Sequence, residues 1–141
     1  MVAPTNVRFS EPVQAALDFF TRRTGERKST VITTAVSEWL RLQDHPQIRF
    51  VTPVPGVRRA ALVDGPEVWS VAEAWTQAAS PERDVTSVSE ATGLRPDQVE
   101  AALSYWADNR EEIDTLVDQI HAAQEAEHAA WQRRRALDLV K

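Results

Sequence analysis

The sequence predicts a mainly helical protein with short β-strands, built as two parts of different character. Apolar residues recur at helical spacing over most of the chain, whereas strict alternation is confined to short runs. The net charge also changes sign. Residues 1–63 hold nine basic and five acidic residues, for +4, and residues 64–141 hold seven and sixteen, for −9. A basic part attracts phosphate and an acidic part is repelled by it, so we expect the two parts to have different partners. The pattern of elements further divides the chain into three expected segments, at 1–43, 44–65 and 66–141.

Composition narrows the class of protein. The 141 residues are 43% hydrophobic and 26% charged, which is normal for a globular chain. Cysteine is absent, which excludes disulfides and thiolate metal sites and fits a reducing compartment. No apolar run has membrane-spanning length, and the first residues lack the apolar core of a signal peptide. We therefore expect a soluble, cytoplasmic protein.

The first 43 residues predict one short strand and two helices. Thr5 to Ser10 alternate as a half-buried strand does, Ser10 is an N-cap candidate followed by Pro12, and Gly25 ends the first helix. Ser29 is expected to cap the second helix. The expected buried residues of the two helices are Val13, Ala16, Leu17, Phe20, Ile32, Ala35, Val36, Trp39 and Leu40. These elements are too few to bury their own apolar faces, so a dimer is expected.

This order of elements resembles the ribbon-helix-helix family of repressors and antitoxins. Thr5-Asn6-Val7-Arg8-Phe9 matches the family's strand, and Gly25-Glu26-Arg27-Lys28-Ser29-Thr30-Val31-Ile32 matches its turn and second helix. The resemblance implies that two chains pair their strands into a ribbon, with Val7 and Phe9 against the helices. Asn6, Arg8 and Pro4 then face the bases of double-stranded operator DNA. Arg suits guanine and Asn suits adenine.

The start of the second helix is the expected phosphate site. Free amides at Ser29 to Val31 and the positive end of the helix dipole lie beside Arg27 and Lys28, so phosphate contacts are expected from Arg27, Lys28, Ser29 and Thr30. Two points weigh against DNA binding by these residues.

The alternative for Asn6 and Arg8 is that they form only the solvent face of an edge strand. Glu11 is acidic where many relatives carry a neutral or basic residue, which would reduce affinity.

The rest of the chain predicts a short hairpin and a helical domain. Strands are expected at Ile48–Val51 and Ala60–Val63, separated by Pro53, Pro55 and Gly56. The expected helices follow at Val68–Trp75, Thr86–Thr92, Pro96–Ala107 and Glu111–Leu139, with Gly93-Leu94 as a turn. The middle pair is typical of a helix-turn-helix, with the small Ala91 at the helix crossing.

This second region also resembles a small bacterial domain family of unknown function, family 433. The matching residues are His45-Pro46-Gln47-Ile48, Val68-Trp69, Ala101-Ala102-Leu103-Ser104-Tyr105-Trp106 and Glu112-Ile113-Asp114. Such domains accompany toxin–antitoxin operons and are regarded as antitoxin-like. The resemblance therefore implies a toxin partner, with PIN-type ribonucleases among the expected ones.

Charge argues against DNA reading by the second region. The helix that would enter the groove presents Asp97, Glu100 and Asp108, which oppose binding to phosphate. Asp97 and Glu100 suit a basic protein surface such as the RNA groove of a ribonuclease, although such acids could simply keep the domain soluble. Trp131 is isolated on a polar helix beside Arg133-Arg134-Arg135. It is expected to contact a partner protein, or else a second copy of the chain.

No motif indicates an enzyme or a cofactor. His121, Glu125 and His128 share one helix face and could hold a metal, but three such residues on an exposed helix are more often solvated. The sequence thus favours an antitoxin-type repressor of a toxin–antitoxin operon, dimeric or larger, which binds its operator and neutralises a toxin. The alternatives are a ribbon-helix-helix regulator whose C-terminal domain only oligomerises or senses a ligand, and a scaffolding protein with no DNA target.

Overall fold

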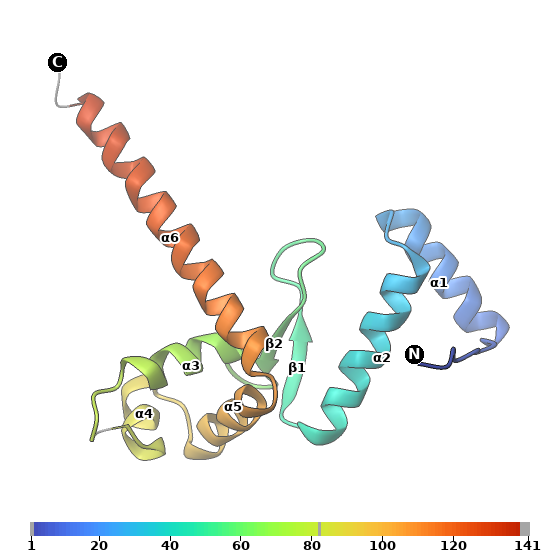
Figure 1. Ribbon diagram of the computed structural model, residues 1–141, viewed down its shortest axis with the longest axis horizontal. Coiled ribbons are helices and arrows are strands. Elements are labelled where there is room, and N and C mark those ends of the chain that lie inside the picture. The colour runs from blue at the N-terminus through green and yellow to red at the C-terminus, as the bar shows by residue number, and fades with distance from the viewer. Residues whose placement is uncertain (1, 82, 139–141) are drawn as a thin grey trace. The chain divides into compact units, whose positions relative to one another are not determined.

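The computed structural model describes residues 2–81 and 83–138, which divide into two compact units. The N-terminal unit covers Met1–Gln43 and the C-terminal unit covers Asp44–Lys141. The described residues are mainly helical, with one two-stranded antiparallel sheet (Figure 1). The predicted fold class of mainly helix with short strands is therefore confirmed. No helix among the described residues is long and apolar enough to cross a membrane.

The N-terminal unit consists of α1 (Glu11–Thr24) and α2 (Lys28–Asp44), the latter ending one residue past the unit boundary. Ser10 precedes α1 in an extended conformation, and Pro12 lies in the first turn, where a missing N–H costs nothing. Gly25 ends α1 with φ 75°, a left-handed conformation that glycine adopts without strain. The helix boundaries of this unit follow local sequence signals.

Two predictions for the N-terminal unit differ from the structure, and a third is not tested by a single chain. Ser29 does not cap α2, which begins one residue earlier, because the Val31 amide already donates to the Arg27 carbonyl. Neither α1 nor α2 contains a buried residue, since two helices alone cannot cover each other's apolar faces. Residues 2–10 are not in a strand in this single chain. A ribbon between two chains would need a second copy, so the predicted strand stays a prediction.

The C-terminal unit begins with a hairpin. Strand β1 (Ile48–Val51) pairs antiparallel with β2 (Arg59–Leu62), with Ile48 opposite Leu62. The predicted hairpin is confirmed, with β2 starting and ending one residue earlier than expected. At its tip Pro55 precedes Gly56, whose φ is 79°, and the Val57 amide donates to the Val54 carbonyl at 3.1 Å. That combination defines a type II turn.

Four helices complete this unit: α3 (Val68–Gln77), α4 (Val85–Thr92), α5 (Pro96–Asp108) and α6 (Arg110–Asp138). α3 packs against α5, α6 and β2, and α5 also contacts both strands. The core is shared by all of these elements; its largest buried side chains are Tyr105, Leu62, Ile113, Val68, Val71, Val88 and Val99. The hairpin thus packs on the helices as part of this unit.

The connection between α4 and α5 is short. Asp84 caps α4 by accepting a 2.7 Å hydrogen bond from the Ser87 amide, and Gly93 ends it with φ 75°. The expected turn at Gly93 is confirmed. Ala91, however, is exposed and does not lie at a helix crossing; Val88 is the buried residue of α4. The position of the Gly93 turn therefore does not predict the inward face of α4, which lies at Val88, one helical turn before Ala91.

Candidate nucleic-acid interface and acidic surface

The predicted base-reading residues all lie on the surface of the N-terminal unit. Pro4, Asn6 and Arg8 are exposed in the segment that precedes α1. The two alternate residues, which were expected to face the helices, differ in exposure: Phe9 is half-buried, whereas Val7 is 65% exposed. Val7 therefore does not pack on the helices in the single chain, and its packing in a ribbon of two chains stays a prediction.

The predicted phosphate residues lie together at the start of α2. Arg27, Lys28, Ser29 and Thr30 are exposed and occupy the end of the helix where the dipole is positive. Val31 does not belong to this group, because its amide is used inside the helix. The arrangement leaves a helix start and two cations on one stretch of surface, which is the chemistry that a phosphate oxygen requires.

Lys28 also has a partner that sequence reasoning missed. Its Nζ lies 2.5 Å from Oδ1 of Asp18 in α1. The hydrogen bond from Lys28 lowers the pKa of Asp18, and Gln14 adds a second donor. The pair ties the start of α2 to the middle of α1. An ammonium group has three donors, so donors of Lys28 remain for an anion, but Asp18 matches its charge as Asp64 and Asp97 match that of Arg95.

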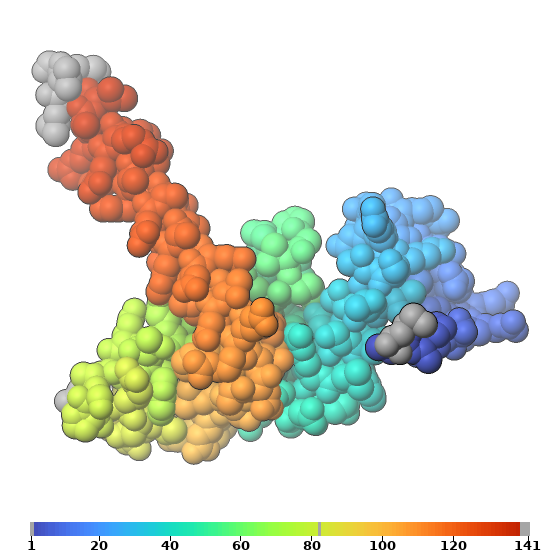
Figure 2. Space-filling model, in the orientation of Figure 1, coloured from blue at the N-terminus to red at the C-terminus, as the bar shows by residue number. Residues whose placement is uncertain are grey.

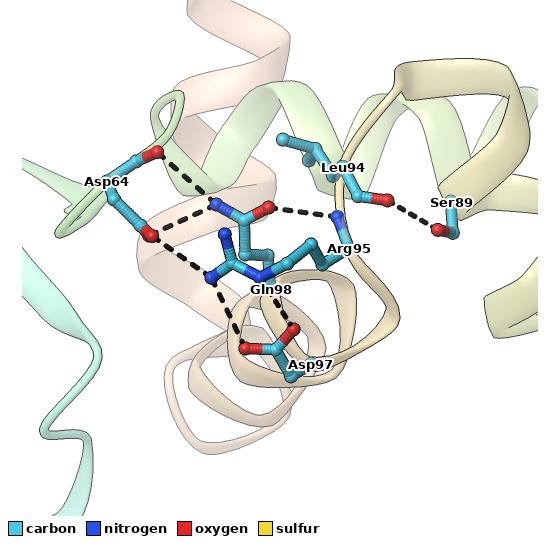
Figure 3. Close-up of polar contacts among 6 residues, drawn as sticks. All are labelled: Asp64, Ser89, Leu94, Arg95, Asp97 and Gln98. Carbon is cyan, nitrogen blue, oxygen red and sulfur yellow. Dashed lines mark hydrogen bonds and ion pairs between the residues drawn. The ribbon is translucent and has the colours of Figure 1, made fainter.

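The acidic surface of α5 is only partly as expected. Glu100 is exposed, as a partner-binding residue would be. Asp97, by contrast, is engaged: its Oδ1 accepts from Arg95 Nε at 3.1 Å. Arg95 Nη2 also donates to Asp64 Oδ2 at 3.0 Å, so one guanidinium lies between two carboxylates (Figure 3). Asp97 and Asp64 raise the pKa of Arg95, so this cation stays charged but is already paired.

Gln98 completes this network from inside. Its side chain is 4% exposed, and its Nε2 donates to the Asp64 backbone carbonyl at 3.3 Å and to Asp64 Oδ1 at 3.1 Å. Its Oε1 accepts from the Arg95 amide at 2.9 Å, which caps α5 (Figure 3). Arg95 and Gln98 together lower the pKa of Asp64. The start of α5 is thus fastened to the turn that follows β2.

α6 is long, and its second half extends beyond the other helices of its unit (Figure 1). Residues from His121 to Asp138 are exposed, apart from Ala129 and Ala130, which are half-buried. Trp131, 46% exposed, stacks on His128 with ring centroids 6.0 Å apart, and Arg135 lies 5.1 Å from its ring centre. The predicted partner residue therefore lies on an accessible surface, flanked by an imidazole and a guanidinium.

His121, Glu125 and His128, which share one face of α6, are exposed, and the two histidines make other contacts. His121 pairs with Glu73 of α3, and His128 stacks on Trp131. Among residues 2–81 and 83–138 no three potential ligands lie close enough to hold a metal ion.

His45 and Tyr105, which belong to two of the stretches that carry the second resemblance, have structural roles. Tyr105 is fully buried, lies edge-on to the His45 ring at 5.2 Å, and donates its hydroxyl to Glu112 at 2.8 Å. The Nε2 atom of His45 lies 2.9 Å from Oδ2 of Asp108. These residues join the entry to β1 with α5 and α6, and their spacing in the sequence reflects core packing.

Comparisons with known proteins add no further constraint. No family model, no curated protein and no solved structure matches the chain.

Proposed function

We propose that this protein is an antitoxin-type transcriptional repressor that acts as a dimer. In this proposal the N-terminal unit pairs with a second copy and binds operator DNA through Asn6 and Arg8. The acidic C-terminal unit binds and neutralises a basic toxin encoded nearby, for which a PIN-type ribonuclease is the leading candidate. The exposed apolar surface of the N-terminal unit is the observation that carries the proposal.

That surface lies on both helices of the unit. On the two helices of this unit, five large side chains are about half exposed or more: Val13 48%, Phe19 61%, Val36 53%, Trp39 61% and Leu40 54%. Covering a side chain of this size stabilises by about 1.5–3 kcal/mol. A second copy offers the same apolar surface, and a two-fold pair would cover both at once. Pairing would also place the two N-terminal segments beside each other, as a ribbon requires.

The charge distribution supports a division of tasks. Residues 1–63 are basic and carry the exposed cations near the start of α2. In the C-terminal unit the one cation at the start of α5 that could meet DNA, Arg95, is paired with Asp64 and Asp97. A helix whose leading cation is occupied and whose neighbours are acidic is poorly suited to a phosphate backbone. A basic protein surface fits it better.

Trp131 supports the protein partner. A half-exposed tryptophan on a helix that extends from the domain can insert into a groove, and tryptophan is enriched among residues that dominate binding energy. Arg135 and His128 hold the ring in place, which reduces the entropy lost on binding.

A pair of variants separates the two surfaces. Sedimentation analysis of the full chain is expected to give a dimer for the wild type and for Trp131→Ala, and a monomer for Trp39→Ala. Co-expression with the product of the adjacent gene is expected to yield a complex and to protect cells from it, and Trp131→Ala is expected to weaken both effects. A monomeric wild type contradicts the dimer. Absence of both complex and protection contradicts the toxin partner and favours a regulator whose C-terminal unit has another role.

A further inference from the structure

A cleft in the C-terminal unit lies between α3 and α6, with α5 in its wall, where these helices pack against one another (Figure 1). Its lining includes Glu73 and Thr76 of α3, Trp106 of α5, and Asp114, Val117 and Asp118 of α6. Its volume is about 210 Å³, whereas pockets for small-molecule ligands usually measure about 300–1,000 Å³. A cleft of this size suits a single side chain better than a cofactor.

Carboxylates dominate the charge of this cleft. Glu73 pairs with His121, and Asp114 Oδ2 lies 3.4 Å from Arg110 Nε, so both acids have a partner inside the unit. Asp118 differs from them. Among residues 2–81 and 83–138, no group forms a hydrogen bond or an ion pair with its carboxylate, which is exposed. Three carboxylates thus meet one guanidinium and one imidazole, and Asp118 is the acid left for an external cation.

The remaining lining suits the methylene groups of a long basic side chain. Val117 and Trp106 are half-buried and give the cleft an apolar wall. The Trp106 ring is held in place because its Nε1 donates to Asp114 Oδ1 at 2.8 Å. Lysine and arginine bury their methylene groups along apolar surface while the charged head reaches a polar partner. An apolar wall beside one unmatched carboxylate is the chemistry that such a side chain requires.

The cleft continues into the surface around Trp131. His121 and His128 are seven residues apart on α6, so they share one helix face and lie about 10 Å apart along its axis. Trp131 stacks on His128. The second half of α6 projects from the other helices of its unit, and most of its side chains are exposed (Figure 2). One partner that lies along α6 can therefore contact both the cleft and Trp131.

We propose that this cleft receives a lysine or arginine side chain of the basic protein partner, whose charged head binds Asp118. The inference rests on the proposed toxin partner and gives it an anchoring point on α3 and α6 rather than at the start of α5. The net charge of −9 over residues 64–141 draws a basic protein toward this unit, and the cleft determines where one of its cations binds.

The test measures binding of the full-length protein to the purified product of the adjacent gene by isothermal titration calorimetry. Asp118→Asn removes the charge with little change in shape and is expected to weaken binding at least about 10-fold, because the partner's cation is left buried and unpaired. Thr76→Phe fills the cleft without changing its charge and is expected to weaken binding to a similar extent. Asp118→Glu keeps the charge and is expected to retain most of the affinity.

A matched control is Glu90→Gln, which removes the same charge from the exposed surface of α4 and is expected to change the affinity by less than about 3-fold. Asp118 and Thr76 are both exposed, so thermal melts of their variants are expected to match that of the wild type.

Each other outcome overturns the proposal. Wild-type affinity in Asp118→Asn or in Thr76→Phe shows that no side chain enters the cleft. An equal loss in Glu90→Gln shows a general effect of net charge, and an equal loss in Asp118→Glu shows that the charge is not what the partner binds. In all of these cases a complex that Trp131→Ala weakens leaves the proposed function standing. If the wild type forms no complex, the toxin partner and the cleft proposal fail together.

Discussion

Replacing Gln98 with leucine is expected to destabilise the C-terminal unit by removing the connection between Asp64 and the start of α5. Gln98 is almost completely buried and makes hydrogen bonds of 2.9, 3.1 and 3.3 Å to Arg95 and Asp64. Leucine has a similar volume but no polar atoms. The Arg95 amide loses its acceptor, and the Asp64 carbonyl and carboxylate lose their donor.

The magnitude follows from these three bonds. A net contribution of about 0.5–1.5 kcal/mol per hydrogen bond gives a loss of roughly 1.5–4.5 kcal/mol. Asp64 is 57% exposed, so water replaces part of what its carboxylate loses, and the burial of leucine returns some stability. We therefore expect a decrease of about 2 kcal/mol in the free energy of unfolding.

Urea denaturation followed by far-UV circular dichroism measures this change. Gln98→Glu keeps an oxygen for the Arg95 amide but removes the donors to Asp64 and adds a second carboxylate beside it, so it is expected to be at least as damaging near neutral pH. Glu100→Gln, on the exposed face of the same helix, serves as the control and is expected to change stability by less than about 0.5 kcal/mol. A Gln98→Leu loss no larger than that of the control would refute the role of the network.

Three further predictions concern neighbouring residues. Because Arg95 and Gln98 lower the pKa of Asp64 below its ordinary 3.8, its contribution to stability is present above that value and is lost as pH falls through the lower folded value. Asp64→Asn should therefore flatten the decline in melting temperature below about pH 4. Gly65→Ala should cost about 1–3 kcal/mol in urea denaturation, because the added Cβ would lie 3.2 Å from Leu62 and 3.3 Å from Gln98 Nε2. Lys28→Gln should weaken binding to every duplex equally in anisotropy titrations, since a phosphate contact carries no base information, and should raise the pKa of Asp18 toward its ordinary value in NMR titration.

The elements that the sequence predicts well are those governed by local chemistry. Pro55 and Gly56 mark the hairpin turn, and Gly25 and Gly93 mark helix ends, because each requires a backbone conformation that few residues adopt. The helix expected over Val68–Trp75 is confirmed as α3, and Val68, Val71 and Ala72 form its buried face. In each case the signal lies within a few residues of its consequence.

The features that the sequence does not predict are contacts between distant residues. Arg95 and Asp64 are thirty-one residues apart, and His121 and Glu73 are forty-eight apart, with no spacing rule that joins them. Trp39 shows a different limit: its helical pattern correctly marks an apolar face, but the pattern does not say whether that face is covered within one chain or by a second one. The predicted DNA residues depend on the same missing copy.

DNA reading by paired N-terminal segments is tested most directly by an anisotropy titration that compares the wild type with Asn6→Ala combined with Arg8→Ala. The wild type is expected to bind the duplex from upstream of its gene more tightly than a scrambled one. Each well-formed base contact contributes about 1–3 kcal/mol of discrimination, so the double variant should lose at least about 10-fold in preference while it keeps weak, salt-sensitive binding. Equal preference in the wild type and the variant would contradict the proposal.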